Sequence, residues 1–214
     1  MYDDESYVVF NKPAGLLVIP TPKNEQNTLV NIVNHQYALK MNGGTLHPCH
    51  RLDRDTSGLI IFAKSKRNQQ MMMELFKQRA VKKKYIAFVH GTLSKRQGEY
   101  RGPVVSLEEK RFRRNFQGEF GITRYQVLEE RKGYSVVEVE PVTGRTNQIR
   151  VHFSHMKHPL VGDRKYSFAR DYDIKFRRVA LHAYQLNWTS PTSHKKIHVK
   201  VELPRDMGEF LEKF

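Results

Sequence analysis

The sequence predicts an α+β fold: a single domain with a central mixed, mostly antiparallel sheet flanked by helices and loops. Three observations support this prediction. The chain has 214 residues, a length that one domain can accommodate. Short apolar runs of strand length dominate the chain, and turn signals join several of them as hairpins. Few strand–helix–strand units are found, so most strands should pair antiparallel.

The N-terminal part is predicted to hold two strands and a helix. Residues 7–10 and 16–19 are apolar runs, and the turn signal Asn-Lys-Pro-Ala-Gly at 11–15 separates them. Thr28 can cap a helix, because the apolar residues that follow it recur at helical spacing.

The central part is predicted to begin with a buried strand at residues 59–63 and a helix capped by Ser65. A further strand is expected at residues 84–90. Residues 125–128 and 136–139 flank a Lys-Gly turn, which predicts a hairpin.

The C-terminal part is predicted to contain two helices and one hairpin. Thr146 can start a helix with apolar residues facing inward. Residues 179–188 and 197–203 are expected to form the hairpin, and residues 204–214 the closing helix.

The chain is strongly basic. It contains 37 Lys and Arg against 22 Asp and Glu, which gives a net charge of +15 at pH 7. This charge favours a polyanionic partner, and nucleic acid above others. A basic protein with no special partner is the alternative.

The composition also excludes several classes of protein. No apolar run reaches the roughly 20 residues that span a bilayer. The acidic residues 1–5 lack the layout of a signal peptide. The lone Cys49 can form neither an internal disulfide nor a Cys-rich zinc site. We therefore expect a cytoplasmic protein.

The densest group of chemically active side chains is His50-Arg51-Leu52-Asp53-Arg54-Asp55-Thr56-Ser57-Gly58. Asp53 stands between Arg51 and Arg54, which should favour its ionised form. An ionised carboxylate next to a strand can act as a nucleophile or a general base. A salt-bridged turn with no catalytic role is the alternative.

A second group lies at residues 141–152, where a Gly turn leads into the predicted helix with Arg145 and Arg150. Helix N-termini bind anions, and Arg adds bidentate donors. The alternative is a capped helix with surface arginines. His152, His155 and His158 follow at three-residue spacing, but this spacing drifts off one helix face, so we expect no metal site.

Two cationic segments could contact a nucleic acid. The first is Lys82-Lys83-Lys84, directly before Tyr85, whose ring could stack on a base beside phosphate contacts. The second is residues 110–114, predicted to lie in a long polar loop. A half-buried strand tyrosine and a solvated basic loop are the alternatives.

Taken together, these segments resemble the RluA-type RNA pseudouridine synthases. Six pieces carry the resemblance, in the order of that family: NKPAGL at 11–16, HRLDRDTSGLIIFAK at 50–64, KYIA at 84–87, TGRTNQIRVH at 143–152, HPLVGD at 158–163 and ALHA at 180–183. Each piece alone is weak, but the ordered set is specific.

The resemblance implies roles for individual residues. Asp53 matches the essential catalytic aspartate, Tyr85 the tyrosine against the target base, and Arg150 the arginine that pairs with that aspartate. Arg51 matches the residue that can fill the gap left by a flipped nucleotide. Asn147 departs from the family, which more often has His there, so its role stays open. The residues expected to contact the RNA backbone are Arg54, Lys82, Lys83, Lys84, Arg111, Arg113, Arg114 and Arg145.

The resemblance also implies a function. Residues 1–214 would form one catalytic domain with an active-site cleft across the sheet and no separate N-terminal S4-type RNA-binding domain. It would convert a specific uridine to pseudouridine in structured RNA, tRNA or rRNA, after flipping the base. We expect no cofactor, no metal, no membrane and no obligatory protein partner, and a monomer. Asp53 could attack C6, attack C1′ or remove a sugar proton.

Two other functions remain open from the residues. A glycosidase or nucleosidase could use Asp53 and Asp55 as a carboxylate pair, since strand positions two apart share a face. Free uracil or free sugar as product would favour it. A non-catalytic RNA-binding module is the second alternative, although it need not have kept Asp53, Tyr85 and Arg150 together.

Overall fold

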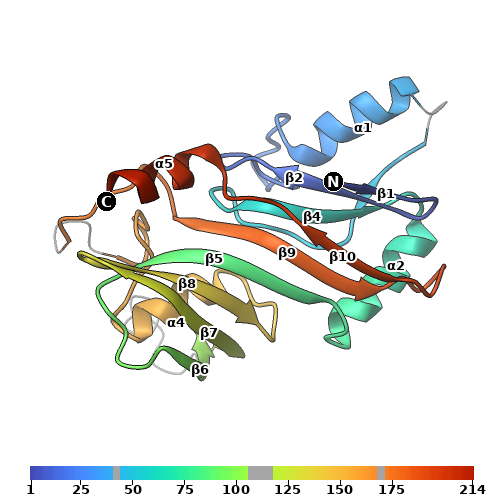
Figure 1. Cartoon of the computed structure of the whole chain (residues 1–214). Helices are drawn as coiled ribbons and strands as arrows, with labels where there is room; N and C mark the ends of the chain where they lie inside the picture. Colours follow the sequence, from blue (N-terminus) through green and yellow to red (C-terminus); the bar gives the residue numbers. More distant parts are fainter. Residues whose placement is uncertain (41–43, 106–117, 168–171) are drawn as a thin grey trace. The chain divides into compact units, whose positions relative to one another are not determined.

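The computed structural model describes residues 1–40, 44–105, 118–167 and 172–214. The chain divides into two compact units. Figure 1 labels the helices and strands of both. Unit 1 comprises Met1–Lys82 and Ala183–Glu202, and unit 2 comprises Lys83–His182 and Leu203–Phe214.

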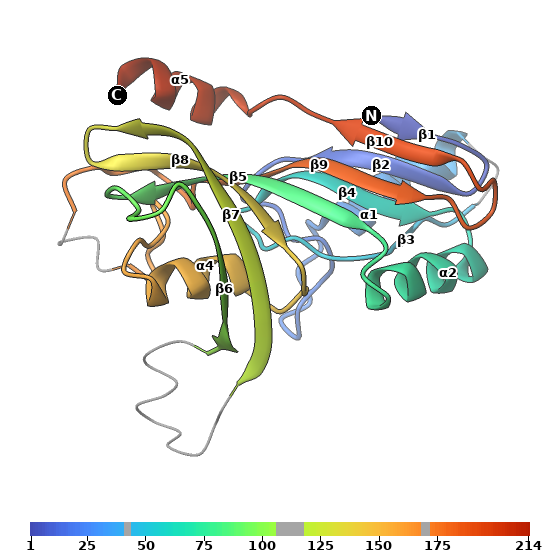
Figure 2. The same ribbon diagram turned by 60° about the horizontal axis from the view of Figure 1, so that its bottom comes forward.

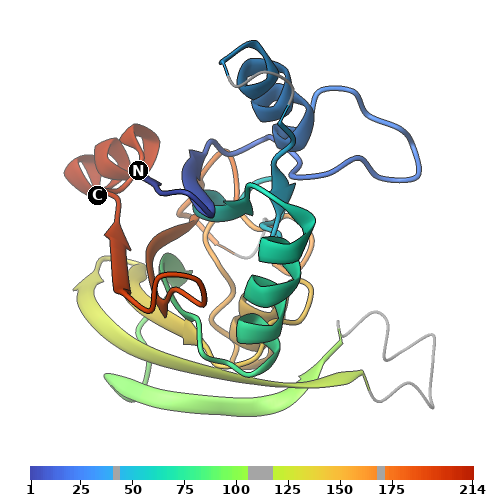
Figure 3. The same ribbon diagram turned by 90° about the vertical axis from the view of Figure 1, so that its right-hand side faces the viewer.

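Unit 1 is a sheet with two helices. Its elements are β1 (Tyr2–Asp3), β2 (Tyr7–Lys12), α1 (Leu29–Lys40), β3 (His47–Pro48), β4 (Ser57–Ala63), α2 (Lys66–Lys77), β9 (Leu181–Thr189, from Ala183 onward) and β10 (Lys196–Lys200). The pairs β1–β2, β2–β4, β3–β4 and β9–β10 are all antiparallel. The connection between β2 and α1 swings away from the strands before the helix begins (Figure 3).

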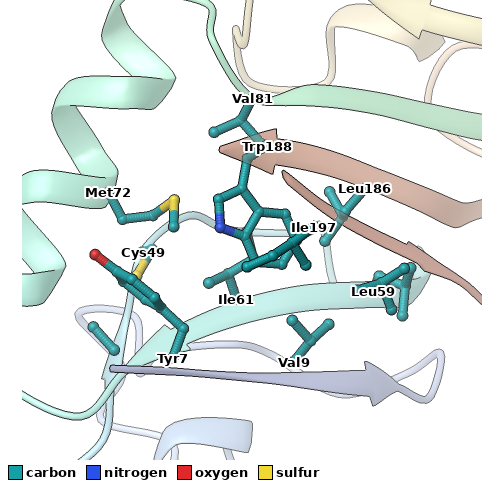
Figure 4. Close-up of a cluster of buried hydrophobic side chains, with 12 residues drawn as sticks. Tyr7, Val9, Cys49, Leu59, Ile61, Met72, Val81, Leu186, Trp188 and Ile197 are labelled. Atoms are coloured by element: carbon teal, nitrogen blue, oxygen red, sulfur yellow. The ribbon is translucent and has the colours of Figure 1, made fainter. Parts of the chain in front are cut away.

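The core of unit 1 joins residues from both parts of the chain that build it (Figure 4). Tyr7, Ile61 and Met72 come from the first part, and Leu186 and Trp188 come from the second. Every residue of β4 is buried, which explains its unbroken apolar run. Ser65 caps α2 by accepting a hydrogen bond from the Asn68 amide at 3.1 Å, as predicted.

In its described residues, unit 2 is a four-stranded antiparallel sheet in the order β5-β8-β7-β6, with two helices. Its elements are β5 (Lys82–His90, from Lys83 onward), β6 (Gln97–Val104), β7 (Glu119–Arg131), β8 (Tyr134–Pro141), α4 (Gln148–His155) and α5 (Arg205–Lys213). The helix α4 packs against β6, β7 and β8 (Figure 2). On α5, the Phe210 ring contacts the rings of Phe88, Tyr134 and Phe176.

The α+β class and the largely antiparallel pairing are confirmed, but three local predictions are wrong. Residues 16–19 form no strand: Leu17 and Val18 instead accept hydrogen bonds from the first amides of α1, Leu29 at 2.8 Å and Val30 at 3.0 Å. These amides have no partner inside the helix. The strand β6 was missed, since Gly98, Gly102 and Pro103 break its pattern.

The third error concerns the start of α4. The helix begins at Gln148, and its N-cap is Asn147 rather than Thr146. Asn147 adopts a left-handed conformation with φ of 55° and makes no side-chain cap bond. The prediction of one domain over residues 1–214 stays a prediction. In the described part of the chain, no helix is long and apolar enough to cross a membrane.

Candidate active site

The Asp53 loop, residues 50–57, leads into β4 in unit 1. Leu52 is buried and anchors the loop, while Asp53 is half-buried and Arg51, Arg54 and Asp55 are exposed. The Thr56 amide donates to the Asp53 carbonyl at 3.1 Å and closes a turn. The loop therefore presents charged side chains from a backbone with a fixed shape.

A buried lysine holds this loop. Lys12 at the end of β2 has no exposed surface, and its ammonium donates to three backbone carbonyls: Pro13 at 2.9 Å, Leu16 at 2.7 Å and Arg54 at 3.0 Å. The Gly15 amide also donates to the Arg54 carbonyl, at 2.9 Å. A buried ammonium needs such partners. Lys12 was predicted only as part of a turn, because nothing in its local sequence indicates a partner at Arg54.

Gly58 lets the loop enter β4. Its φ is +115°, and a Cβ at this position would lie 2.2 Å from the Ala183 carbonyl oxygen. Only glycine fits there. At the other end of the loop, the His50 Nε2 accepts a hydrogen bond from the Ile61 amide at 3.1 Å, and its ring lies 4.8 Å from that of Phe76. His50 thus fixes the start of the loop.

The three consecutive lysines before Tyr85 have different surroundings. Lys82 is exposed. The Lys83 Nζ lies 3.4 Å from the position that a Cβ on Gly144 would take, and burial lowers the pKa of Lys83 to about 8. The Lys84 Nζ pairs with the Glu138 carboxylate at 2.6 Å. Tyr85 is 7% exposed on β5 and lies opposite Val139 of β8.

Gln148 shapes the turn between β8 and α4. Its side-chain oxygen accepts hydrogen bonds from the Thr143 hydroxyl at 2.6 Å and the Arg145 amide at 3.1 Å. Its side-chain nitrogen donates to the Ile122 carbonyl at 2.9 Å and to the Thr123 hydroxyl at 3.0 Å. Buried Gln148 therefore fixes the segment that carries Arg145 and Arg150, and the sequence analysis assigned it no role.

Arg150 points from α4 to a buried carboxylate. Its Nε and Nη2 donate to the two oxygens of Asp163 at 2.7 and 2.9 Å, and its Nη1 donates to the Asn147 side-chain oxygen at 2.8 Å. This gives Asn147, whose role was open, a contact with the guanidinium. Asp163 belongs to the HPLVGD piece, but no role was predicted for it. The predicted pairing of Arg150 with Asp53 stays a prediction.

Two further arginines of the predicted RNA surface form ion pairs. Arg145 pairs with Glu119 at 2.7 Å, and Arg54 pairs with Glu25 at 3.3 Å. All four side chains are substantially exposed or half-buried, so these pairs add little to stability. Arg111, Arg113 and Arg114 lie outside the described residues.

The three spaced histidines bind different partners. The Nδ1 of His152 lies 2.8 Å from the Thr123 hydroxyl, that of His155 lies 3.2 Å from the Tyr100 hydroxyl, and that of His158 lies 2.9 Å from the His90 carbonyl. Burial lowers the pKa of His152 to about 4. Among the residues that the structure describes, no group of three or more His, Cys, Asp or Glu is placed to hold a metal ion.

Comparisons with known proteins show the family to which this chain belongs. A family model described as RNA pseudouridylate synthase matches residues 6–155. The chain is 35% identical to an uncharacterised RNA pseudouridine synthase of Bacillus subtilis, over 99% of this chain and 71% of that protein. It is 34% identical to ribosomal large subunit pseudouridine synthase D of Zymomonas mobilis, over 97% of this chain and 69% of that protein. The solved structure of human RNA pseudouridylate synthase domain containing 4 matches with a TM-score of 0.84 at 28% identity, over 99% of this chain and 91% of that one.

Proposed function

The chain belongs to the RNA pseudouridylate synthases, enzymes that isomerise uridine to pseudouridine, and we propose that it acts on ribosomal RNA with Asp53 as its catalytic carboxylate. The observation that supports this assignment most directly is the Asp53 loop. It presents a carboxylate beside two arginines on a backbone that Lys12 holds through Arg54. A fixed carboxylate is what the reaction requires from the protein.

The reaction needs no redox partner. The N1–C1′ bond breaks, the uracil turns, and a C5–C1′ bond forms, while the proton on C5 leaves and N1 takes up a proton. Asp53 can start this sequence by adding to C6, by adding to C1′ or by removing a sugar proton. The reacting atoms lie within the base stack of folded RNA, so the uridine must first flip out.

Three further residues take the roles that the family pattern gives them. Tyr85 lies against the flipped uracil, Arg150 pairs with the Asp53 carboxylate, and Arg51 fills the gap in the RNA. The exposed Arg51 side chain suits this role, since a guanidinium can stack on neighbouring bases.

Ribosomal RNA is favoured over tRNA as the substrate because one of the related proteins is named for the large ribosomal subunit. The net charge of +15 suits a polyanion of this size. Lys82, Lys83, Arg54 and Arg145 are the described residues proposed to contact phosphates. Lys84 takes a lesser part, because Glu138 already neutralises it. A monomer in the cytoplasm remains our prediction.

The experiment follows tritium release from RNA labelled at C5 of uridine, because the new bond displaces that hydrogen. Asp53→Asn should abolish release while RNA affinity stays within about twofold, since Lys and Arg dominate binding. Asp55→Asn is the matched control, as it changes an exposed carboxylate in the same loop and should retain most activity. Substantial release by Asp53→Asn would overturn the assignment.

Two other outcomes would support the alternatives. Free uracil or sugar among the products, with equal losses in both variants, would indicate a nucleosidase with a carboxylate pair. RNA binding without turnover would indicate a binding module. The RNA class is tested by mapping pseudouridines in ribosomal RNA and tRNA from cells with and without the gene. A modification lost only from tRNA would contradict the ribosomal substrate.

A further inference from the structure

Arg164 is the one arginine in the described part of unit 2 that forms no ion pair with a carboxylate. Each of the other nine does: Arg96, Arg101, Arg124, Arg131, Arg145, Arg150, Arg177, Arg178 and Arg205. Lys165, the next residue, has no carboxylate partner among the described residues either, and both side chains are exposed. Two adjacent cations therefore face solvent at this turn.

Asp163, the acid next to this pair, is already engaged. Its two oxygens accept hydrogen bonds from the Arg150 guanidinium at 2.7 and 2.9 Å, and its side chain has no exposed surface. Its Oδ1 also accepts from the amides of Lys165 at 3.0 Å and Tyr166 at 3.1 Å. Asp163 cannot turn outward to Arg164 without breaking these bonds, so the two charges of the turn are presented in full.

The backbone that carries the two cations is fixed on both sides. Before the turn, the Val161 amide donates to the Phe88 carbonyl of β5 at 2.8 Å. A Cβ on Gly162 would lie 1.9 Å from a backbone carbonyl oxygen, which shows how tightly the chain is packed there. After the turn, the Ser154 hydroxyl of α4 donates to the Tyr166 carbonyl at 2.8 Å. A ligand that binds this turn therefore pays little entropy for ordering the backbone.

An arginine and a lysine on a fixed turn suit the phosphodiesters of a nucleic acid. A guanidinium can donate two N–H groups to one phosphate, and an ammonium acts as a compact charge. The Lys165 Nζ lies 5.0 Å from the centre of the Tyr166 ring, an attraction that limits where the ammonium points. We propose that Arg164 and Lys165 form a phosphate-binding turn for the RNA backbone, in addition to the residues named above. This inference rests on the proposed function, because it takes RNA as the ligand.

The turn suits RNA better than an acidic segment of a protein. A protein interface needs an apolar centre. The exposed large apolar side chains of the described residues all lie elsewhere in the chain, at Met1, Ile19, Met73, Phe120, Leu128 and Phe214. A phosphate contact needs no apolar surface.

The salt dependence of RNA binding tests the proposal. Filter binding of a large-subunit ribosomal RNA fragment at several salt concentrations gives the slope of log affinity against log salt. Arg164→Ala and Lys165→Ala should each reduce the magnitude of this slope by about one, because each removes a phosphate contact. Arg164→Lys keeps the charge and should keep the slope. An unchanged slope in Arg164→Ala would overturn the proposal.

Arg177→Ala is the matched control. It removes the same charge from the same unit, and the Arg177 side chain is 78% exposed, but its guanidinium already pairs with Asp206 at 3.5 Å. We expect it to change the slope by less than about half a unit. Equal changes in Arg164→Ala and Arg177→Ala would mean that the slope follows net charge alone, which would contradict a specific contact at the turn.

The reaction rate distinguishes a phosphate contact from a part in the chemistry. The single-turnover rate of Arg164→Ala at saturating RNA should stay within about twofold of the parent, because a phosphate contact positions the RNA and takes no part in the bond changes. A rate loss at saturation with an unchanged slope would overturn the proposal. If the parent binds RNA but forms no pseudouridine, the proposed function fails, and the slopes still test the turn.

A footprint on the parent protein gives an independent test. Acetic anhydride acetylates exposed lysines, and mass spectrometry locates the modified residues. Lys165 should lose reactivity when the ribosomal RNA fragment is bound. Lys132, exposed in the turn between β7 and β8, should react equally in both states. Equal reactivity of Lys165 with and without RNA, or equal protection of both lysines, would rule out the phosphate-binding turn.

Discussion

Lys12 donates a hydrogen bond of 3.0 Å to the backbone carbonyl of Arg54, 42 positions further along the chain. Arg54 directly follows Asp53, so a side chain at the end of β2 sets the backbone next to the proposed catalytic carboxylate. The same ammonium also holds the carbonyls of Pro13 and Leu16. The turn after β2 and the Asp53 loop are therefore a single hydrogen-bonded structure.

Lys12→Met should lower the free energy of unfolding by about 3 kcal/mol, because three backbone carbonyls lose the ammonium that donates to them and the thioether supplies no donor. Urea denaturation monitored by tryptophan fluorescence measures the change, since Trp188 lies in the core of unit 1. Lys200→Met, at an exposed position of β10, is the control and should change stability little. Equal midpoints for the two variants would contradict this prediction.

Tyr85→Phe and Tyr85→Ala separate the two parts of the tyrosine. If the ring stacks on the flipped uracil, Tyr85→Ala should lose the stacking free energy between ring and base, roughly 1–3 kcal/mol. We expect the hydroxyl to assist removal of the C5 proton as well, so Phe should bind RNA normally but form product slowly. Single-turnover rates at saturating RNA decide between these roles. Parent-like rates for both variants would show that Tyr85 does not reach the base.

Lys82 and Lys84 should differ in their effect on RNA binding. Lys82 is exposed, whereas Glu138 neutralises Lys84 at 2.6 Å. Lys82→Ala should therefore lower the slope of log affinity against log salt by about one, and Lys84→Ala should change it less. Filter binding at several salt concentrations provides the measurement. A larger change for Lys84 would mean that RNA displaces Glu138.

The protein should become less stable as the pH is lowered, because His152 is buried. Burial lowers its pKa from 6.5 to about 4, so the unfolded chain binds a proton between these values that the folded chain does not. The free energy of unfolding therefore decreases as pH falls from about 6.5 to 4. His90 contributes in the same direction, since its pKa is also lowered to about 4 by burial.

His152→Asn should make this pH dependence shallower but not abolish it, since His90 remains. The measurement is a series of urea denaturation curves from pH 4.5 to 7. His198→Asn, at an exposed position of β10, should retain the parent slope. The same slope in all three proteins would show that His152 is not kept neutral by the fold.

The sequence predicts well those helices and strands that are determined by their own residues and immediate neighbours. Ser65 caps α2 through its own side chain, and the unbroken apolar run of β4 reflects burial on both faces. The error at residues 16–19 has a different origin. The carbonyls of Leu17 and Val18 accept hydrogen bonds from the first amides of α1. An apolar run alone does not show whether its residues form a strand or cap a helix in this way.

The candidate site shows the same division. Asp53, Tyr85 and Arg150 could be predicted because they stand in recognisable short pieces. Lys12 and Asp163, which hold the surrounding segments, stand in two other pieces of the same set, and each has its partner in a different piece. Hydrogen bonds of this kind have no signature in local periodicity or charge, so they can be recognised only in the folded structure.

Unit 1 is made from two parts of the chain that are synthesised at different times, Met1–Lys82 and Ala183–Glu202. At roughly 5–20 residues per second, the second part leaves the ribosome several seconds after the first. This second part contains Ala183, whose backbone packs against Gly58. It also contains Trp188, which lies in the core of unit 1. The Asp53 loop is thus translated early but completed late, so a growing chain that lacks this last part is not yet a competent enzyme.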